Sequence, residues 1–327
     1  MADRLLPDNA QLERFAAGLD RLAPPGSKLG IAVSGGPDSL ALLLLASAAR
    51  PGAIEAASVD HKLRPGSLAE AEMVAELCAK LEVPHAILSA RWAQTPETAI
   101  QERARDERYR LLGRWAAKRG LDALVTAHHL DDQAETFLMR LDRGAGVRGL
   151  AGMRDASLLP GGDLRLIRPL LGWRRTELET LCASVGVKAV MDPANRDERF
   201  ERVRVRKTLA QADWLDPEKI ARSAGNLARA DEALDWAALS EWELQLRRSG
   251  EEIAYRPSAP TEIRRRVVGR IVTALAREGR ENPLRGSELD RLCAILEGGG
   301  KATLRGVLCT GGEEWSFKRA PQRRKTG

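Results

Sequence analysis

The amino-acid sequence predicts an α/β fold, a doubly wound and mostly parallel sheet, followed by a second, smaller and mainly helical α+β domain. Short apolar runs alternate with helical segments of about 10–15 residues along the first part of the chain, which is typical of a parallel sheet covered on both faces. From about residue 215 onward, longer helices replace this alternation. We therefore expect a catalytic domain at 1–214 and a second domain at 215–327.

The first domain is expected to alternate four strands with four helices. The predicted strands are 28–33, 54–59, 86–88 and 123–127, and the predicted helices are 38–50, 68–81, 98–118 and 131–141. Polar residues follow three of these strands, at Ser34, Asp60 and His128. Because ligands of doubly wound sheets bind beyond the carboxyl ends of the strands, these residues predict the position of the functional site.

The second domain is expected to be built from three helices and a terminal hairpin. The predicted helices are 217–246, 261–277 and 287–296. The hairpin is predicted from strands 303–308 and 314–318, with Gly311 and Gly312 in the turn between them.

The composition excludes several classes of protein. Of 327 residues, 43% are hydrophobic and 30% charged, which is typical of a soluble globular chain, and 4% aromatics argue against a site built on aromatic stacking platforms. No apolar run approaches the ~20 residues of a membrane span, and residues 1–8 lack the apolar stretch of a secretory signal. The four cysteines form no CxxC pair, which fits reduced thiols and a cytoplasmic protein; they are Cys78, Cys182, Cys293 and Cys309.

The net charge of +6 is unevenly distributed. Residues 196–207 contain six basic and three acidic side chains, and residues 318–327 contain five basic and no acidic ones. Such clusters suit a polyanionic partner such as RNA, but a solvated surface or tail explains them equally well.

A glycine-rich loop between the first strand and the first helix predicts a phosphate site. It consists of Ser34, Gly35, Gly36, Pro37, Asp38 and Ser39. The glycines let the backbone approach an anion, and the N–H groups of a helix N-terminus favour negative charge. The serines can add hydroxyl donors, and the aspartate can hold Mg²⁺ against phosphate oxygens. The Gly-Lys-Ser/Thr ending of a Walker P-loop is absent, and a capped helix after a tight turn is the alternative.

Five blocks of sequence together resemble the tRNA(Ile)-lysidine synthetases, a family of ATP pyrophosphatases. The blocks are the loop 34–39, VDHKLR at 59–64, residues 102–109, AHHLDDQAET at 127–136 and RGAGVRGL at 143–150. The loop matches the SGGxDS pattern of the whole superfamily. The last two blocks narrow the resemblance to lysidine synthetases and close tRNA-modifying relatives, and residues 168–171 and 192–195 favour the lysidine synthetases.

The resemblance implies an adenine nucleotide α-hydrolase-like fold and a ligase that uses ATP and Mg²⁺. Such an enzyme joins L-lysine to C2 of the wobble cytidine of tRNA(Ile) with a CAU anticodon, through an adenylated base, and releases AMP and pyrophosphate. The partners implied are tRNA(Ile) and L-lysine, without a membrane, and a homodimer is left open.

The resemblance also implies roles for individual residues. ATP binding falls to the loop 34–39 with Asp60 and His61, and Mg²⁺ binding to Asp38. Catalytic roles fall to Asp38, Arg108, Asp132 and Glu135, of which Asp132 and Glu135 also bind lysine. The tRNA contacts implied are Arg202, Arg204 and Arg206.

Several of these residues also support such roles by their chemistry. Asp132 and Glu135 are spaced i, i+3 on one helix face, where two carboxylates suit an ammonium group or a metal, although the helix dipole alone also favours acids there. Arg108 has no acidic residue one turn away, which favours a phosphate ligand over a helix-surface ion pair. Asp60 and His61 end a strand where a ribose or base would lie, and a strand-ending cap is the alternative for Asp60.

Other patterns are weaker. His128 and Asp132 are spaced i, i+4 as metal ligands can be, but a zinc site would need a third ligand. The GxGxxG pattern at 144–149 follows a helix rather than a strand, so a dinucleotide site is rejected. Alternating Arg and Val at 199–206 fits an exposed strand or a helix surface, and Val203 stands where the family has asparagine.

Three other functions are kept as alternatives. A tRNA thiolase of the same superfamily would usually carry cysteine pairs, which this chain lacks. A metal-dependent phosphohydrolase would use His61, His128 and Asp132. A non-catalytic ATP-binding sensor would bind ATP without releasing pyrophosphate.

Overall fold

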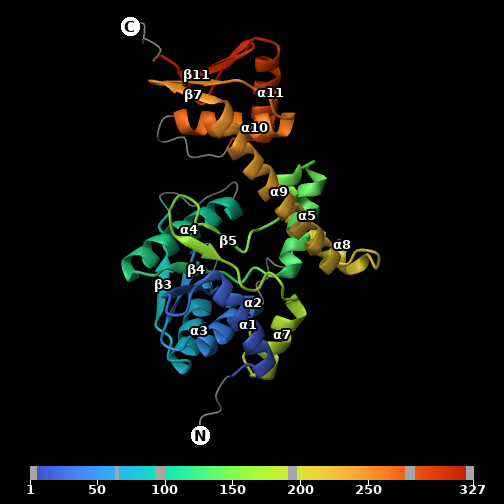
Figure 1. The fold of residues 1–327 in the computed structure, drawn as a ribbon. Coiled ribbons are helices and arrows are strands. Elements are labelled where there is room, and N and C mark those ends of the chain that lie inside the picture. The colour runs from blue at the N-terminus through green and yellow to red at the C-terminus, as the bar shows by residue number, and fades with distance from the viewer. Residues whose placement is uncertain (1–5, 63–65, 93–99, 191–196, 277–283, 322–327) are drawn as a thin grey trace. The chain divides into compact units, whose positions relative to one another are not determined.

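A computed structural model describes residues 6–62, 66–92, 100–190, 197–276 and 284–321 (Figure 1). The chain divides into two compact units, Met1–Ala228 and Arg229–Gly327. The division falls inside the long helix α9 (Pro217–Gln245), and the boundary expected at residue 214 lies just before this helix.

The first unit contains a six-stranded sheet in the order β3-β2-β1-β4-β6-β5. Its strands are β1 (Leu29–Ala32), β2 (Ile54–Asp60), β3 (His85–Ser89), β4 (Ala123–Val125), β5 (Ala156–Leu158) and β6 (Arg165–Ile167). All neighbouring pairs are parallel except β5 with β6. The predicted doubly wound, mostly parallel sheet is confirmed, whereas the antiparallel edge formed by β5 and β6 was not predicted.

Helices cover both faces of this sheet (Figure 1). They are α1 (Asn9–Leu22), α2 (Pro37–Ala49), α3 (Ser67–Lys80), α4 (Ile100–Arg119), α5 (Leu130–Asp142), α6 (Val147–Leu150), α7 (Arg175–Ser184) and α8 (Glu201–Gln211). One core packs α1, α2, α3 and α7 on one face, and a second packs α4 on the other. The sequence did not predict α1 and α7, and it left open whether the α8 segment is a strand or a helix.

Helix α2 lies at the centre of the first core. Residues Leu40–Ala46 are all 0–1% exposed, as expected of a helix that is apolar on every side. Truncating one of these leucines to alanine costs about 2–5 kcal/mol in a core of this kind. The helix is therefore a rigid support for the loop 34–39 that enters it.

Close packing on the face of the sheet that α4 covers depends on Gly30 in β1. A Cβ atom at this position would lie 2.8 Å from side-chain atoms of both Trp115 and Leu121, closer than real contacts allow. The absence of a side chain lets α4 and the turn after it approach the central strand.

The second unit packs the C-terminal part of α9 and two further helices against an antiparallel sheet with the order β7-β8-β11-β10-β9. Its elements after α9 are β7 (Leu246–Ser249), β8 (Glu252–Tyr255), α10 (Thr261–Leu275), α11 (Gly286–Glu297), β9 (Lys301–Leu304), β10 (Val307–Thr310) and β11 (Trp315–Arg319). Tyr255 and Trp315 form an edge-to-face pair with ring centroids 5.7 Å apart in its core.

The terminal hairpin was predicted with one error. β10 and β11 pair around Gly311 and Gly312 as expected. However, the predicted strand 303–308 contains a turn of its own, because Arg305 and Gly306 have φ of 53° and 81°. Two consecutive left-handed residues make the tight turn that joins hairpin strands, so this segment folds back as β9 and β10.

Some predicted features lie outside the described residues. These are the motif at 192–195, residues 63–64 of the second family block and most of the basic tail. The four cysteines are free and buried. In the described ranges, no helix has both the length and the apolar character needed to cross a membrane.

Candidate active site

The predicted site residues meet at the carboxyl edge of the parallel sheet. The loop 34–36 leaves β1, Asp60 ends β2, and residues 126–129 lead from β4 into α5. Because β1 lies between β2 and β4, these three segments are neighbours. The connections turn in opposite directions on the two sides of β1, which is the switch point where ligands of doubly wound sheets bind.

The glycine-rich loop is held in a conformation suited to an anion. Gly35 has φ of +84°, a value that favours glycine, and Pro37 occupies the first position of α2. The Ser39 hydroxyl accepts a hydrogen bond from Ser34 N at 3.1 Å and lies 2.9 Å from Gly36 O, to which it donates. The N-terminus of α2 is thereby fixed with its free N–H groups at the switch point.

Asp38 carries an unsatisfied oxygen in the first turn of α2. Its Oδ1 is buried and has no hydrogen-bond partner among the described residues, and its Oδ2 lies 3.6 Å from His129 Nε2. Mg²⁺ takes one or two protein carboxylates and completes its shell with phosphate oxygens and water. The Asp38 carboxylate therefore fits Mg²⁺ held jointly with a nucleotide.

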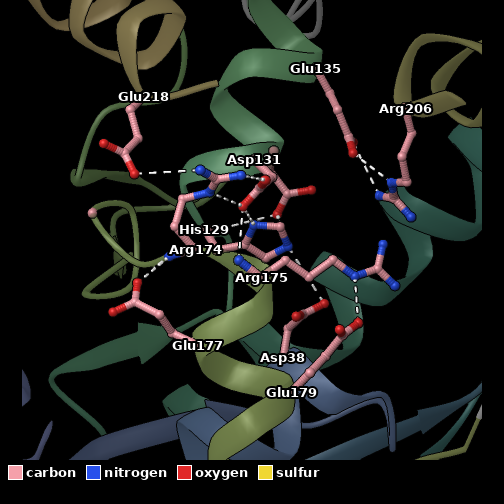
Figure 2. A network of polar contacts seen from close by, with 12 residues as sticks. Asp38, His129, Asp131, Glu135, Arg174, Arg175, Glu177, Glu179, Arg206 and Glu218 are labelled. Carbon is pink, nitrogen blue, oxygen red and sulfur yellow. Dashed lines mark hydrogen bonds and ion pairs between the residues drawn. The ribbon is translucent and has the colours of Figure 1, made fainter. Parts of the chain in front are cut away.

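His129 lies between three carboxylates. It is 2% exposed, with Nε2 at 3.6 Å from Asp38 and Nδ1 at 3.6 Å from Asp131 (Figure 2). Its Nε2 also lies 3.5 Å from Asp132. Burial alone would lower the pKa of His129, but the three carboxylates outweigh it and raise the pKa to about 10. At neutral pH the ring is therefore an imidazolium that neutralises part of this acidic cluster.

Replacing His129 with glutamine is expected to lower stability more at neutral pH than at alkaline pH. Because the folded pKa of about 10 lies above the ordinary value of 6.5, the stabilisation is fully present below pH 6.5 and is lost as pH rises through 10. We expect a loss on the order of a few kcal/mol at pH 7 that shrinks toward pH 10. Urea denaturation of both proteins at pH 7, 8.5 and 10 measures it, and a pH-independent difference would contradict this charge assignment.

Asp131 contacts His129 and also anchors the start of α7. It accepts hydrogen bonds from Arg174 Nη2 at 3.1 Å and from Arg175 N at 2.8 Å (Figure 2). Burial raises its pKa, but His129 and these donors outweigh burial, so the pKa lies well below its usual range. Arg174 was not among the residues predicted from the sequence; Glu177, whose carboxylate accepts the Arg174 backbone N–H at 2.7 Å, is a helix-start signal that could have located it.

Glu135 is the most deeply buried carboxylate of the site, at 1% exposed. Arg206 of α8 binds it through both oxygens, at 2.6 and 3.1 Å (Figure 2). Arg202 Nε lies 3.4 Å from the same carboxylate. Two of the three arginines predicted to face RNA are thus directed at Glu135. The third, Arg204, is exposed and donates to the backbone carbonyls of Glu198 and Arg199.

Asp132 lies on the same side of the site as Glu135. It accepts the N–H of His129 at 3.2 Å, and its Oδ1 lies 3.9 Å from Arg202 Nη1. Burial raises the pKa of Asp132, but the charges of His129 and Arg202 outweigh it and lower the pKa. The predicted pair of carboxylates, Asp132 and Glu135, is therefore present, with arginines of α8 beside both.

Arg108 is a cation without a carboxylate partner in the part of the chain that the structure describes. Its guanidinium and that of Arg105 lie 5.3 and 5.0 Å from the centre of the Tyr109 ring. Burial is the main cause that lowers the pKa of Arg108. The charges of Arg105 and Arg202 lower it further, whereas Tyr109 raises it. A guanidinium stays charged under such conditions, so this group favours an anionic ligand.

The residues after β2 have mixed roles. Asp60 is buried, and its Oδ1 accepts Ser67 Oγ at 2.6 Å and Lys62 N at 2.9 Å, which is the capping role weighed as its alternative. His61 Nδ1 is buried without a hydrogen-bond partner among the described residues. Burial lowers the pKa of His61, and Arg108 lowers it further, so its ring is neutral at pH 7.

His128 does not act as the cation of the site. Its Nδ1 lies 2.9 Å from Thr126 Oγ1. Burial lowers the pKa of His128 to about 3; the charge of Asp132 raises this pKa, but the nearby arginines Arg168, Arg105 and Arg108 lower it. Within the described ranges, no group of three or more His, Cys, Asp or Glu side chains is arranged to hold a metal ion. The charged histidine among the carboxylates is instead its neighbour His129.

Comparisons with known proteins support the parallel sheet and the glycine-rich loop of the first unit. The family model of the PP-loop domain matches residues 8–213. The tRNA(Ile)-lysidine synthase of Novosphingobium aromaticivorans is 48% identical over 315 residues, which cover 95% of this chain and 94% of that protein. The enzyme of the same name from Zymomonas mobilis is 42% identical over 306 residues, covering 93% and 92%.

Among solved structures, the U34-tRNA thiolase of Methanococcus maripaludis, a protein with a [4Fe-4S] cluster, matches with a TM-score of 0.55. The match covers 69% of this chain and 80% of the thiolase, at 18% identity. Identity this low supports a shared fold and nothing about the reaction.

Proposed function

The chain belongs to the tRNA(Ile)-lysidine synthase family of PP-loop enzymes, and from this premise we propose how its residues carry out the reaction. The enzyme uses ATP to form lysidine in tRNA(Ile). The thiolase alternative gains no further support, because that likeness concerns the fold alone. We assign L-lysine as the amine and Mg²⁺ as the cation.

One observation carries the assignment of the site. His129 Nε2 lies 3.6 Å from the Asp38 carboxylate at the phosphate loop and 3.5 Å from the Asp132 carboxylate on the amine-binding side. A single imidazolium thus separates the group suited to a nucleotide phosphate from the group suited to an ammonium. The reaction requires this proximity, since the amine attacks a base that carries the adenylate.

In the first step, the C2 oxygen of cytidine attacks the α-phosphorus of ATP, and the bond to pyrophosphate breaks. We assign the departing phosphates to the loop 34–39 and the charge that develops on the α-phosphate to Arg108. Asp38 would hold Mg²⁺, which neutralises charge on the phosphates. Asp60 and His61 lie where the ribose or adenine would rest.

In the second step, the ε-amine of lysine attacks C2, and the bond to AMP breaks. The amine must arrive as an ammonium and lose its protons. Asp132 and Glu135 bind the ammonium groups of lysine, and Asp132 is the better proton acceptor because Arg206 does not hold it in a two-point ion pair. Catalysis rests mainly on positioning and on fixed charges.

The test is incubation of the protein with ATP, Mg²⁺, labelled L-lysine and a tRNA(Ile) transcript with a CAU anticodon. Label should enter acid-precipitable RNA only when ATP is present. A transcript with uridine at the wobble position is the matched control and should stay unlabelled. ATP binding without any incorporation would refute the synthetase and return the sensor and the thiolase to consideration.

Replacing Arg108 with glutamine is expected to lower kcat by about 100-fold, because one charge-assisted contact to the reacting phosphate is lost. Arg108→Lys should recover little, since an ammonium cannot form the two parallel hydrogen bonds of a guanidinium. Arg110→Gln on the same helix is the control, because Arg110 pairs with Glu107 at the surface. Steady-state lysine incorporation measures all three, and an Arg108→Gln enzyme within threefold of wild type would rule out this role.

We also propose that residues 215–327 help to hold the tRNA and that the enzyme works in the cytoplasm, where ATP, lysine and tRNA are present. Exposed arginines on β7, Arg247 and Arg248, support the first proposal.

A further inference from the structure

Trp214 is 79% exposed, which makes it the most exposed large hydrophobic residue of the described chain. It lies in the turn 212–216 between α8 and α9, where Leu215 N donates to Ala212 O at 3.1 Å. The Asp216 carboxylate accepts Glu218 N at 2.8 Å at the start of α9, which fixes the end of the turn. The fold therefore presents an indole to solvent on an ordered turn, in a chain with few aromatic residues.

Helix α8 connects this indole to the active site. On its inner side, Arg202 and Arg206 contact Glu135. The α-helical rise and the maximum span of the residues that follow place Trp214 within about 18 Å of Arg206 along the chain. The amine-binding side of the site and the indole are therefore close enough for one RNA loop to contact both.

The outer side of α8 is polar and basic. Its exposed residues include Arg204, Lys207, Thr208 and Gln211. Lys207 forms an ion pair with Glu198. Arg204 donates its hydrogen bonds to two backbone carbonyls rather than to a carboxylate, so these bonds do not neutralise its charge. Cations and hydrogen-bond donors beside an aromatic plane are the combination that binds single-stranded nucleic acid.

We propose that Trp214 and the outer side of α8 form the docking surface for the single-stranded loop of the substrate RNA, with the indole stacked on a base next to the one that reacts. This inference rests on the proposed function, because it takes the anticodon loop as the ligand. The reacting base must leave the stack of its loop to reach the site, which deprives its neighbours of a stacking partner. The indole replaces that partner, and Arg204 holds the backbone beside it.

The test measures binding of a fluorescently labelled stem-loop RNA with a CAU loop to the full-length protein by anisotropy. Trp214→Ala should raise Kd roughly tenfold, and Trp214→Phe should stay within about threefold of wild type because an aromatic plane remains. Trp236→Ala is the matched control, since Trp236 is 71% exposed on α9 but is not assigned to this surface. It should stay within about twofold.

Two further readouts separate stacking from a change in fold or chemistry. In lysine incorporation with full-length tRNA, Trp214→Ala should raise KM for tRNA about tenfold and leave kcat at saturating tRNA within about twofold. Arg204→Gln should reduce the slope of log Kd against log salt by about 0.7, the value for one phosphate contact to a single strand. A duplex RNA without a loop should bind wild type and Trp214→Ala equally.

The surface is refuted if Trp214→Ala binds the stem-loop as wild type does, or if Trp236→Ala loses as much. It is also refuted if Trp214→Phe is as weak as Trp214→Ala, because stacking would then not be the cause. None of the binding measurements requires turnover. A wild-type protein that binds the loop through Trp214 but never incorporates lysine would therefore overturn the proposed function and leave this surface standing.

Discussion

Replacing Asp38 with asparagine is expected to reduce kcat/KM for lysidine formation by at least about 10³-fold, the largest effect of any substitution in the phosphate loop. The variant keeps the shape of the side chain but removes the charge that would hold Mg²⁺ at the buried Oδ1, which has no hydrogen-bond partner among the described residues. It also removes one of the three carboxylates around His129. Lysine incorporation and pyrophosphate release, measured at saturating ATP, give the effect.

Asp20→Asn is the matched control for this substitution. Asp20 forms an ion pair with Arg50, which follows the C-terminal end of α2 and so lies away from the loop 34–39 at its N-terminal end; any effect of the substitution should fall on stability rather than on catalysis. We expect its activity to equal that of wild type. An Asp38→Asn enzyme that keeps more than a tenth of wild-type kcat/KM would show that the loop acts without this carboxylate.

Replacing Glu135 with glutamine is expected to weaken lysine use about 100-fold in KM and to lower the free energy of unfolding by about 3 kcal/mol. Both effects have one cause. Glu135 is almost fully buried beside Arg206 and Arg202, so its neutralisation leaves Arg206 without its ion-pair partner and Arg202 with Asp132 alone, at the place proposed for lysine. Lysine KM and urea denaturation at pH 7 measure the two effects separately.

The same pair of helices provides the control. Glu201 of α8 pairs with Arg143, next to the end of α5, but both side chains are about one third exposed or more. Glu201→Gln should therefore change stability by less than about 1 kcal/mol and leave the KM for lysine unchanged. Equal losses in the two variants would mean that Glu135 only joins α5 to α8, and lysine recognition would have to be assigned elsewhere.

Local patterns in the sequence were enough to predict the sheet and the position of the site. Strands inside a parallel sheet are buried on both faces, so the runs 54–59 and 123–127 are largely apolar along their whole length. Such runs can be recognised without knowing which distant residues they contact. Polar residues at the ends of such strands must then meet at one edge. The strands β5 and β6 were missed because, unlike the equally short β4, neither is a fully buried apolar run: Ala156–Leu158 contains a serine and Arg165–Ile167 begins with an exposed arginine.

The C-terminal hairpin shows the limit of such patterns. Thr303–Leu308 has the composition of one strand, yet left-handed backbone at Arg305 and Gly306 reverses the chain within it. An arginine at such a position is uncommon, so the turn is specified by the pairing of β9 with β10 and by the core beneath them rather than by the turn residues alone.

The sequence by itself determined the fold class, the phosphate loop and the presence of Asp132 and Glu135 on one helix face, because each depends on residues close together in the chain. Only the tertiary structure decided the charge of His129, which depends on carboxylates from both α2 and α5. It also decided that Arg202 and Arg206 face Glu135, more than sixty residues away, while Arg204 remains exposed. Electrostatic roles are set by which charges folding brings within a few ångströms and removes from water, and sequence spacing does not encode that distance.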